Sequence, residues 1–141
     1  DRGNQMTNNF RFSLRSEGNL KGVNPALVKV VRRALELTTV DFIVIEGVRT
    51  QARQRELWAQ GRTTPGKIVT WTMKSKHLEG KAVDLLPVTG WENLSSFKAV
   101  SKAMLQAASE LGVKITWGAD WNGNGIQEKG EDDSPHFELS A

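Results

Sequence analysis

The stretch Ser75-Lys-His77-Leu-Glu-Gly80-Lys-Ala82-Val-Asp84-Leu-Leu86 contains one of the chain's two histidines and leads into a short apolar strand. The second histidine lies in Asp133-Ser-Pro-His136-Phe-Glu138-Leu, close to the C-terminus. Because the chain has no cysteine, these two imidazoles are its only imidazole or thiolate ligands for a metal. Two histidines and one carboxylate fill three positions around a catalytic zinc and leave the fourth for water. The sequence therefore indicates a zinc hydrolase.

Length and composition indicate one globular domain that spans residues 1–141. Of the 141 residues, 38% are hydrophobic and 25% are charged, which suffices for a single core but leaves no room for a second domain. The absence of cysteine excludes disulfides and zinc-thiolate sites. Residues 1–5 precede Met6, and we interpret them as a remnant added ahead of the natural start.

Charge and hydropathy exclude two classes of partner. No apolar run approaches the roughly 20 residues of a membrane span, and the N-terminus lacks the sections of a signal peptide, so we expect no stable membrane insertion. The net charge of +3 favours weak attraction to anionic polymers. Lysine and arginine are spread along the chain without the basic cluster of a nucleic-acid reader, so we expect no nucleic-acid partner.

The order of predicted elements favours an α+β fold, in which helices flank a small, mostly antiparallel sheet and the zinc site lies in a surface cleft. Asn24-Pro25 provides a helix cap and a proline at the first helical position, and Gly112 ends a later helix that has a buried apolar stripe. Residues 62–76 are expected to form a long surface loop. The predicted elements are a helix from Pro25, a strand over 41–48, a helix from Thr50 to about Gly61, a strand over 82–86, a helix over about 95–111, and strands over 113–117 and 136–139.

The spacing of the histidines and acidic residues resembles that of a known family of zinc peptidases. Ser75-x-His77-x-x-Gly80-x-Ala82-x-Asp84, followed by Asp133-x-x-His136, is similar to the pattern of D-alanyl-D-alanine carboxypeptidases, vancomycin-resistance dipeptidases and phage L-alanyl-D-glutamate endopeptidases. Asn24-Pro25, Glu46-Gly-Val-Arg49-Thr50 and Trp117-Gly-Ala-Asp120-Trp121-Asn122 resemble the phage endolysin branch in particular. The resemblance covers residues 24–139, which is nearly the whole chain.

The resemblance implies a role for each matching position. It makes His77, Asp84 and His136 the zinc ligands, and Asp133 the general base that takes a proton from the attacking water. The seven-residue spacing between His77 and Asp84 suits this assignment, because a turn at Gly80 followed by a strand can bring both side chains to one metal. His136 must then come from a separate strand.

Further roles follow from the same resemblance. Arg49 matches an arginine that assists at the scissile carbonyl, which suits a fixed cation beside a developing oxyanion. Ser75 is expected to support His77 or the substrate through a hydrogen bond. The wider family often has the longer glutamate in place of Asp133, so three acidic neighbours remain alternative bases: Glu131, Asp132 and Glu138.

A second metal pattern, independent of any family, lies within residues 118–134. It matches a calcium loop with oxygen ligands at positions 1, 3 and 5, a glycine at the sharp turn and a glutamate at position 12. Gln127 replaces the usual apolar residue and the flanks are not an obvious helix pair, so a surface loop without tight binding is the alternative. Calcium would order the segment that carries Asp133, which predicts activation by calcium. The ligand positions are Asp120, Asn122, Asn124, Ile126 through its carbonyl, Glu128 through water, and Glu131.

We therefore expect a zinc-dependent peptidoglycan hydrolase of the endolysin type, with the L-alanyl-D-glutamate bond of the stem peptide as its substrate. The alternatives are a D-alanyl-D-alanine carboxypeptidase or dipeptidase, and a non-catalytic module that binds the cell wall or calcium. The resemblance further implies a monomer made in the host bacterial cytoplasm. Such a protein reaches the wall after a separate membrane-permeabilising protein has acted.

Overall fold

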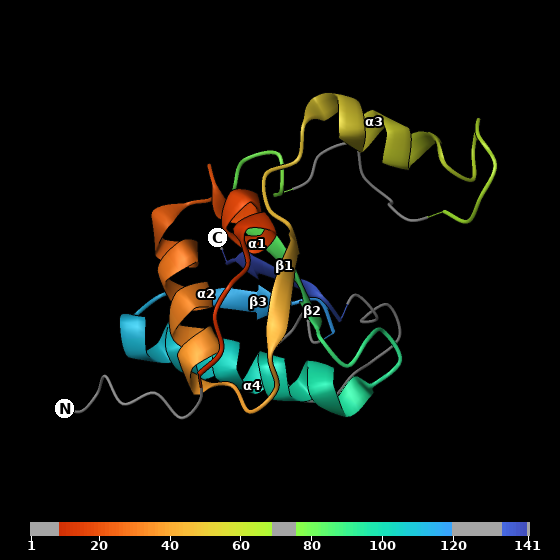
Figure 1. The fold of residues 1–141 in the computed structure, drawn as a ribbon. Helices are drawn as coiled ribbons and strands as arrows, with labels where there is room; N and C mark the ends of the chain where they lie inside the picture. Colours follow the sequence, from red (N-terminus) through yellow and green to blue (C-terminus); the bar gives the residue numbers. More distant parts are fainter. Residues whose placement is uncertain (1–8, 69–75, 120–133, 141) are drawn as a thin grey trace.

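Four antiparallel strands form the sheet on which the described part of the chain is arranged (Figure 1). The computed structural model describes residues 9–68, 76–119 and 134–140. The strands are β1 (Phe42–Glu46), β2 (Ala82–Pro87), β3 (Ile115–Trp117) and β4 (His136–Leu139). Their order in the sheet is β1-β2-β4-β3, so the last strand of the chain lies beside β2 rather than at an edge.

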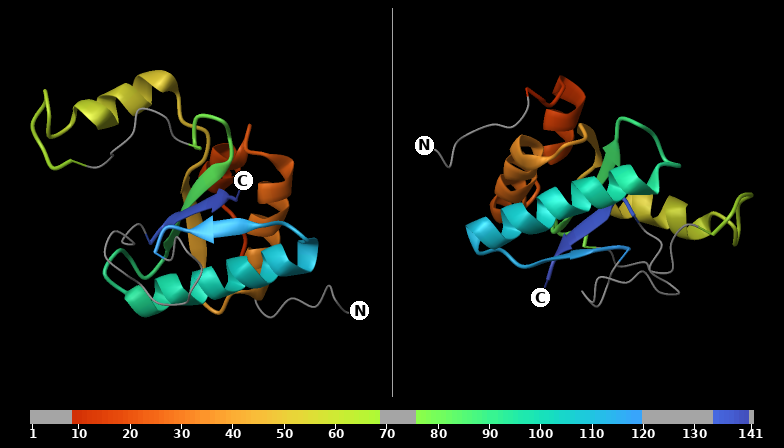
Figure 2. Two further views of the ribbon diagram at one scale, coloured as in Figure 1. Left: turned by 180° about the vertical axis from the view of Figure 1, so that it is seen from behind. Right: turned by 90° about the horizontal axis from the view of Figure 1, so that it is seen from below.

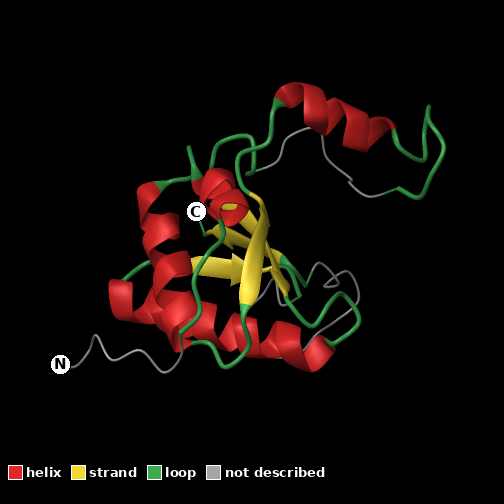
Figure 3. Ribbon diagram, in the orientation of Figure 1, coloured by secondary structure: helices red, strands yellow, loops and turns green. Residues whose placement is uncertain are grey.

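The helices of the described chain are α1 (Leu14–Leu20), α2 (Pro25–Leu37), α3 (Gln51–Ala59) and α4 (Leu94–Leu111). α2 and α4 pack against each other on one side of the sheet, and α1 packs on β1 (Figure 3). Figure 2 shows α4 extending along this side of the sheet in both of its views. α3 instead projects away from the sheet, and Gln54 is its one buried residue (Figure 1). None of these helices is long and apolar enough to cross a bilayer.

Successive side chains along β2 and β4 point to opposite faces of the sheet, so one face forms the core and the other is polar. Val83, Leu85 and Phe137 point towards the helices and are buried. Asp84 and His136 occupy the intervening positions, so their side chains leave the opposite face of the sheet. The core is completed by Leu27, Val30, Val31 and Ala34 of α2, Phe42 and Val44 of β1, and Val100, Met104 and Ala107 of α4.

The predicted α+β fold with an antiparallel sheet is confirmed, and the differences are local. The strand expected over 41–48 spans only 42–46, and its pairing with β2 shifts at a bulge between Val44 and Glu46. α3 ends at Ala59, two residues before Gly61. The sequence did not predict α1, which has only seven residues, contains Gly18 and buries only Ser16 and Leu20.

The caps that the sequence predicted are present. The side chain of Asn24 accepts a hydrogen bond from the amide of Ala26 at the start of α2. The side chain of Thr50 accepts one from the amide of Arg53 at the start of α3. Gly112 ends α4 in the left-handed conformation, with φ of 69°. Local sequence signals therefore set these helix ends.

Candidate metal centre

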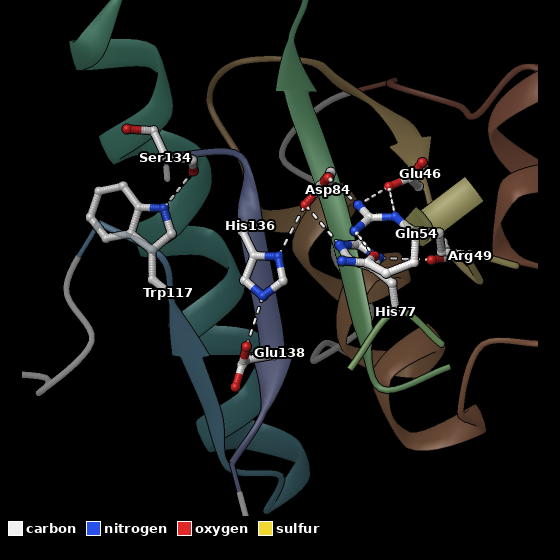
Figure 4. Close-up of polar contacts among 10 residues, drawn as sticks. Glu46, Arg49, Gln54, His77, Asp84, Trp117, Ser134, His136 and Glu138 are labelled. Carbon is white, nitrogen blue, oxygen red and sulfur yellow. Dashed lines mark hydrogen bonds and ion pairs between the residues drawn. The ribbon is translucent and has the colours of Figure 1, made fainter. Parts of the chain in front are cut away.

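Strand register places Asp84 at the centre of the polar face. Asp84 is paired with Glu46 of β1 on one side and with His136 of β4 on the other, so three polar residues form a row across three strands. The Oδ1 atom of Asp84 lies 3.2 Å from Nδ1 of His136 (Figure 4). The same oxygen lies 3.3 Å from Nε2 of His77. One oxygen of Asp84 therefore contacts both histidines.

His77 reaches this row from a tight turn that precedes β2. Gly80 closes the turn with φ of 71°, and its amide donates to the carbonyl of His77. The Nδ1 atom of His77 lies 2.8 Å from the carbonyl oxygen of Gly47, which accepts its proton. This contact leaves Nε2 directed at Asp84 with its lone pair. The ring is 1% exposed, so packing as well as hydrogen bonding fixes its orientation.

The two histidine rings meet edge to face, with their centroids 5.0 Å apart. One ligand atom from each of His77, Asp84 and His136 lies within 4.8 Å of the others, close enough to share one metal ion. The structure thus brings together the three residues that the sequence predicted to share a metal. Their two imidazole nitrogens and one carboxylate oxygen fit a transition metal better than Mg²⁺ or Ca²⁺, which prefer oxygen ligands.

The histidines also control the charge of Asp84. Burial disfavours the carboxylate, but the contacts with His136 and then with His77 favour it more strongly, so the pKa of Asp84 lies well below its usual value. An ionised aspartate beside two imidazoles can accept a cation without first losing a proton.

Arg49 follows β1 and lies beside the same aspartate. Its guanidinium forms an ion pair with Glu46 and donates from Nη1 to Oε1 of Gln54 over 2.7 Å. Its Nη2 atom lies 4.0 Å from Oδ2 of Asp84. The backbone amide of Arg49 also donates to the carbonyl of His77. Arg49 is therefore a fixed cation at the edge of the row, although a role at the scissile carbonyl stays a prediction.

Comparisons with known proteins agree with this geometry. Residues 8–140 match the model of the phage L-alanyl-D-glutamate peptidases. The chain belongs to this family. It is 41% identical to the L-alanyl-D-glutamate peptidase of Escherichia phage T5, with 92% of this chain and 98% of that protein covered.

Two bacterial proteins are similar as well. The chain is 30% identical to the peptidoglycan L-alanyl-D-glutamate endopeptidase CwlK of Bacillus subtilis, over 71% of this chain and 61% of CwlK. The crystal structure of ChiX, the L-Ala D-Glu endopeptidase of Serratia marcescens, matches with a TM-score of 0.75 and 37% identity. That match covers 93% of this chain and 90% of ChiX. The predicted family resemblance is confirmed.

Several residues predicted for this family member lie outside the described residues. They include the supporting serine, the proposed base and the whole calcium pattern. In the sequence, the calcium pattern lies between β3 and β4, which pair with each other. Next to the strand ends, Nε1 of Trp117 donates to the carbonyl of Ser134 over 2.6 Å. The residues concerned are Ser75, Asp120, Asn122, Asn124, Ile126, Glu128, Glu131, Asp132 and Asp133.

The sequence did not identify three of the contacts that hold the site. The carbonyl of Gly47 orients His77, and the buried side chain of Gln54 binds Arg49. Neither contact has a sequence signal, because each joins different elements across the fold. Glu138, predicted as an alternative base, instead contacts Nε2 of His136 at 2.8 Å. A signal for this contact was available, since residues two apart on a strand share a face.

Proposed function

We propose that the protein is a zinc-dependent peptidoglycan hydrolase that cleaves the bond between L-alanine and D-glutamate in the stem peptide. The convergence of His77, Asp84 and His136 on the polar face of the sheet carries this proposal. The relatives from phage T5, Bacillus subtilis and Serratia marcescens are all named for this bond. Those names favour it over the D-alanyl-D-alanine bond and over a non-catalytic module.

The metal would be held by Nε2 of His77, Oδ1 of Asp84 and Nδ1 of His136, because these atoms face one another. Bound zinc supplies a water of lowered pKa and polarises the peptide carbonyl. Three protein ligands leave a fourth position for that water, as in other hydrolytic zinc sites.

The remaining steps fall to acidic and basic groups of the chain. We assign Asp133 as the base that takes the proton of the attacking water and returns it to the leaving amine. We assign Arg49 to the oxygen of the scissile carbonyl, where negative charge develops. The ion pair with Glu46 and the hydrogen bond to Gln54 support this second assignment, because a cation that is already fixed needs little rearrangement in the transition state.

Calcium binding by residues 120–131 is a further part of the proposal, supported by the ligand pattern of the sequence. The described flanks add a physical link. In the sequence, residue 131 comes three positions before Ser134, whose carbonyl accepts a hydrogen bond from Nε1 of Trp117, and His136 follows two positions after Ser134. Ordering of the segment by calcium would therefore act on Asp133 and on the approach to the metal.

Turnover at fixed zinc, with calcium either supplied or buffered away, tests the calcium proposal. We expect lower turnover without calcium and in Glu131→Ala. Equal turnover of the wild-type protein with and without calcium, together with full activity of Glu131→Ala, would overturn it.

Mass spectrometry of fragments released from purified peptidoglycan tests the main proposal. Native, zinc-stripped and zinc-restored protein are compared, with Asp133→Ala as the catalytic control. New carboxyl ends on L-alanine and amino ends on D-glutamate that depend on zinc are expected. Release of D-alanine or its dipeptide would support the carboxypeptidase or dipeptidase alternative instead. Wall binding without any cleavage would favour a non-catalytic module.

A further inference from the structure

The ring of His136 is held on both sides by carboxylates from different strands (Figure 4). Asp84 of β2 lies 3.2 Å from Nδ1, and Oε1 of Glu138 lies 2.8 Å from Nε2. His136 and Glu138 are two residues apart on β4, so both side chains leave the same face of the sheet. Glu138 therefore occupies the side of the ring that points away from the proposed metal position.

Lys76 fixes the carboxylate of Glu138 in turn. The Nζ atom of Lys76 lies 3.1 Å from Oε2 of Glu138 and donates to the carbonyl of Leu139 over 2.6 Å. The side chains of Lys76 and Glu138 are only 31% and 20% exposed, so water screens their attraction less than it screens a surface pair. Lys76 directly precedes His77 in the chain. One lysine thus connects the segment of the first histidine to the strand of the second.

The shorter of the two contacts, 2.8 Å to Glu138 against 3.2 Å to Asp84, favours the tautomer of His136 that carries its proton on Nε2. A neutral imidazole has one N–H, and a carboxylate can only accept. A hydrogen bond from Nε2 to Glu138 therefore leaves Nδ1 with a lone pair that faces Asp84. In His77 the proton is on the other ring nitrogen, because Nδ1 donates to the carbonyl of Gly47. Each histidine has its own partner that selects its tautomer.

We propose that Glu138, anchored by Lys76, is a positioning residue that keeps the proton of His136 on Nε2 and presents Nδ1 to the metal. The proposal rests on the zinc site proposed above and deepens it. It also removes Glu138 from the alternative bases, because its carboxylate is engaged by His136 and Lys76 rather than directed at the metal position.

Zinc affinity and the His136 tautomer test this role directly. Affinity is measured by competition with a chromogenic chelator, and the tautomer by long-range ¹H–¹⁵N NMR correlations of the histidines with and without Zn²⁺. In Glu138→Ala we expect zinc affinity to fall by roughly 10- to 100-fold and the metal-free His136 to show a mixture of tautomers. Glu138→Gln keeps an acceptor for Nε2 and should recover most of the affinity.

Glu79→Ala is the matched control. Glu79 forms an exposed ion pair with Lys81 at 3.4 Å, and we expect its removal to leave zinc affinity within about twofold of the wild type. A general base behaves differently from a positioning residue, because loss of the base lowers turnover at every zinc concentration without weakening zinc binding. Glu138→Ala should instead lose turnover most strongly when zinc is scarce.

Zinc affinity within twofold of the wild type and an unchanged His136 tautomer in Glu138→Ala would overturn the proposal. If that variant does not fold, Lys76→Met tests the same role, and unchanged affinity and tautomer there would also overturn it. Neither readout depends on which peptide bond is cut. A wild-type protein that binds zinc through this geometry but leaves the L-alanyl-D-glutamate bond intact would contradict the proposed function alone.

Discussion

Substitution of Gly47 by alanine should both destabilise the fold and loosen the metal centre. A Cβ atom at this position would lie 1.9 Å from the backbone oxygen of Asn19 and 2.9 Å from Cγ2 of Val23. The chain around Asn19 cannot easily retreat, because its side-chain amide donates to the carbonyl of Val44 over 2.8 Å. Relief of such an overlap requires a backbone shift of more than about 1 Å, at a cost of about 3 kcal/mol.

The same shift would displace the carbonyl of Gly47 that holds Nδ1 of His77. We therefore expect Gly47→Ala to lower the free energy of unfolding in urea by about 3 kcal/mol with an unchanged m value. Zinc affinity should fall as well, because the first histidine loses its fixed orientation. Zinc competition and urea unfolding of the metal-free protein separate these two effects.

Gly18→Ala provides a matched control within α1. A Cβ atom at Gly18 meets no atom within 4 Å, and glycine is a poor helix former, so this variant should be more stable by about 0.5–1 kcal/mol. Zinc affinity should not change. If Gly47→Ala lowers the free energy of unfolding by less than about 0.5 kcal/mol, which is within the range of ordinary surface substitutions, then the close approach of the Asn19 backbone does not exclude a side chain at this position.

Three further predictions follow from contacts of the described residues. Gln54→Leu removes the buried hydrogen-bond partner of Arg49, so we expect it to lower the free energy of unfolding in urea by about 1–3 kcal/mol and to leave zinc affinity unchanged. A fall in zinc affinity in this variant would contradict the prediction. The hydrogen bonds from Arg32 lower the pKa of Glu17 in the folded protein. This exposed pair therefore contributes its full stabilisation at pH values above the pKa of glutamate in the unfolded chain, about 4.3, and the contribution is lost as the pH falls through the lower pKa of the folded protein. Glu17→Gln should thus lower the free energy of unfolding by about 0.5 kcal/mol at pH 7. An equal loss under strongly acidic conditions would show that the loss does not come from the ion pair with Arg32. Phe137→Ala should cost about 3–5 kcal/mol, because this buried ring stacks on Trp117, and a thermal unfolding curve like that of the wild type would exclude such a contribution.

The metal centre depends on contacts that are remote in sequence. His77 is oriented by the carbonyl of Gly47, which follows β1, and the glutamate beside His136 is anchored by Lys76, 60 positions before that histidine. Neither the contact with Gly47 nor the one with Lys76 could form within a single strand or turn. The sheet order β1-β2-β4-β3 makes these contacts possible, because it places the two histidine segments on either side of Asp84.

Elements with strong local signals were predicted well from the sequence. The cap at Asn24, the left-handed Gly112 and the apolar stripe of α4 lie within the elements that they define, so no knowledge of the fold was needed. α1 was missed because its seven residues bury little and include a glycine. The end of β1 was misplaced because it depends on pairing with β2, in which Glu46 opposite Asp84 is the last pair.

The sequence by itself determined which residues are suited to hold a metal, because the chain has only two histidines and no cysteine. Their spacing from Asp84 and the turn at Gly80 are likewise local properties. Only the tertiary structure decided which nitrogen of each histidine faces Asp84, and that Lys76 anchors the glutamate beside His136. These features depend on carbonyls and side chains brought in by strand pairing, whose register no short stretch of sequence specifies.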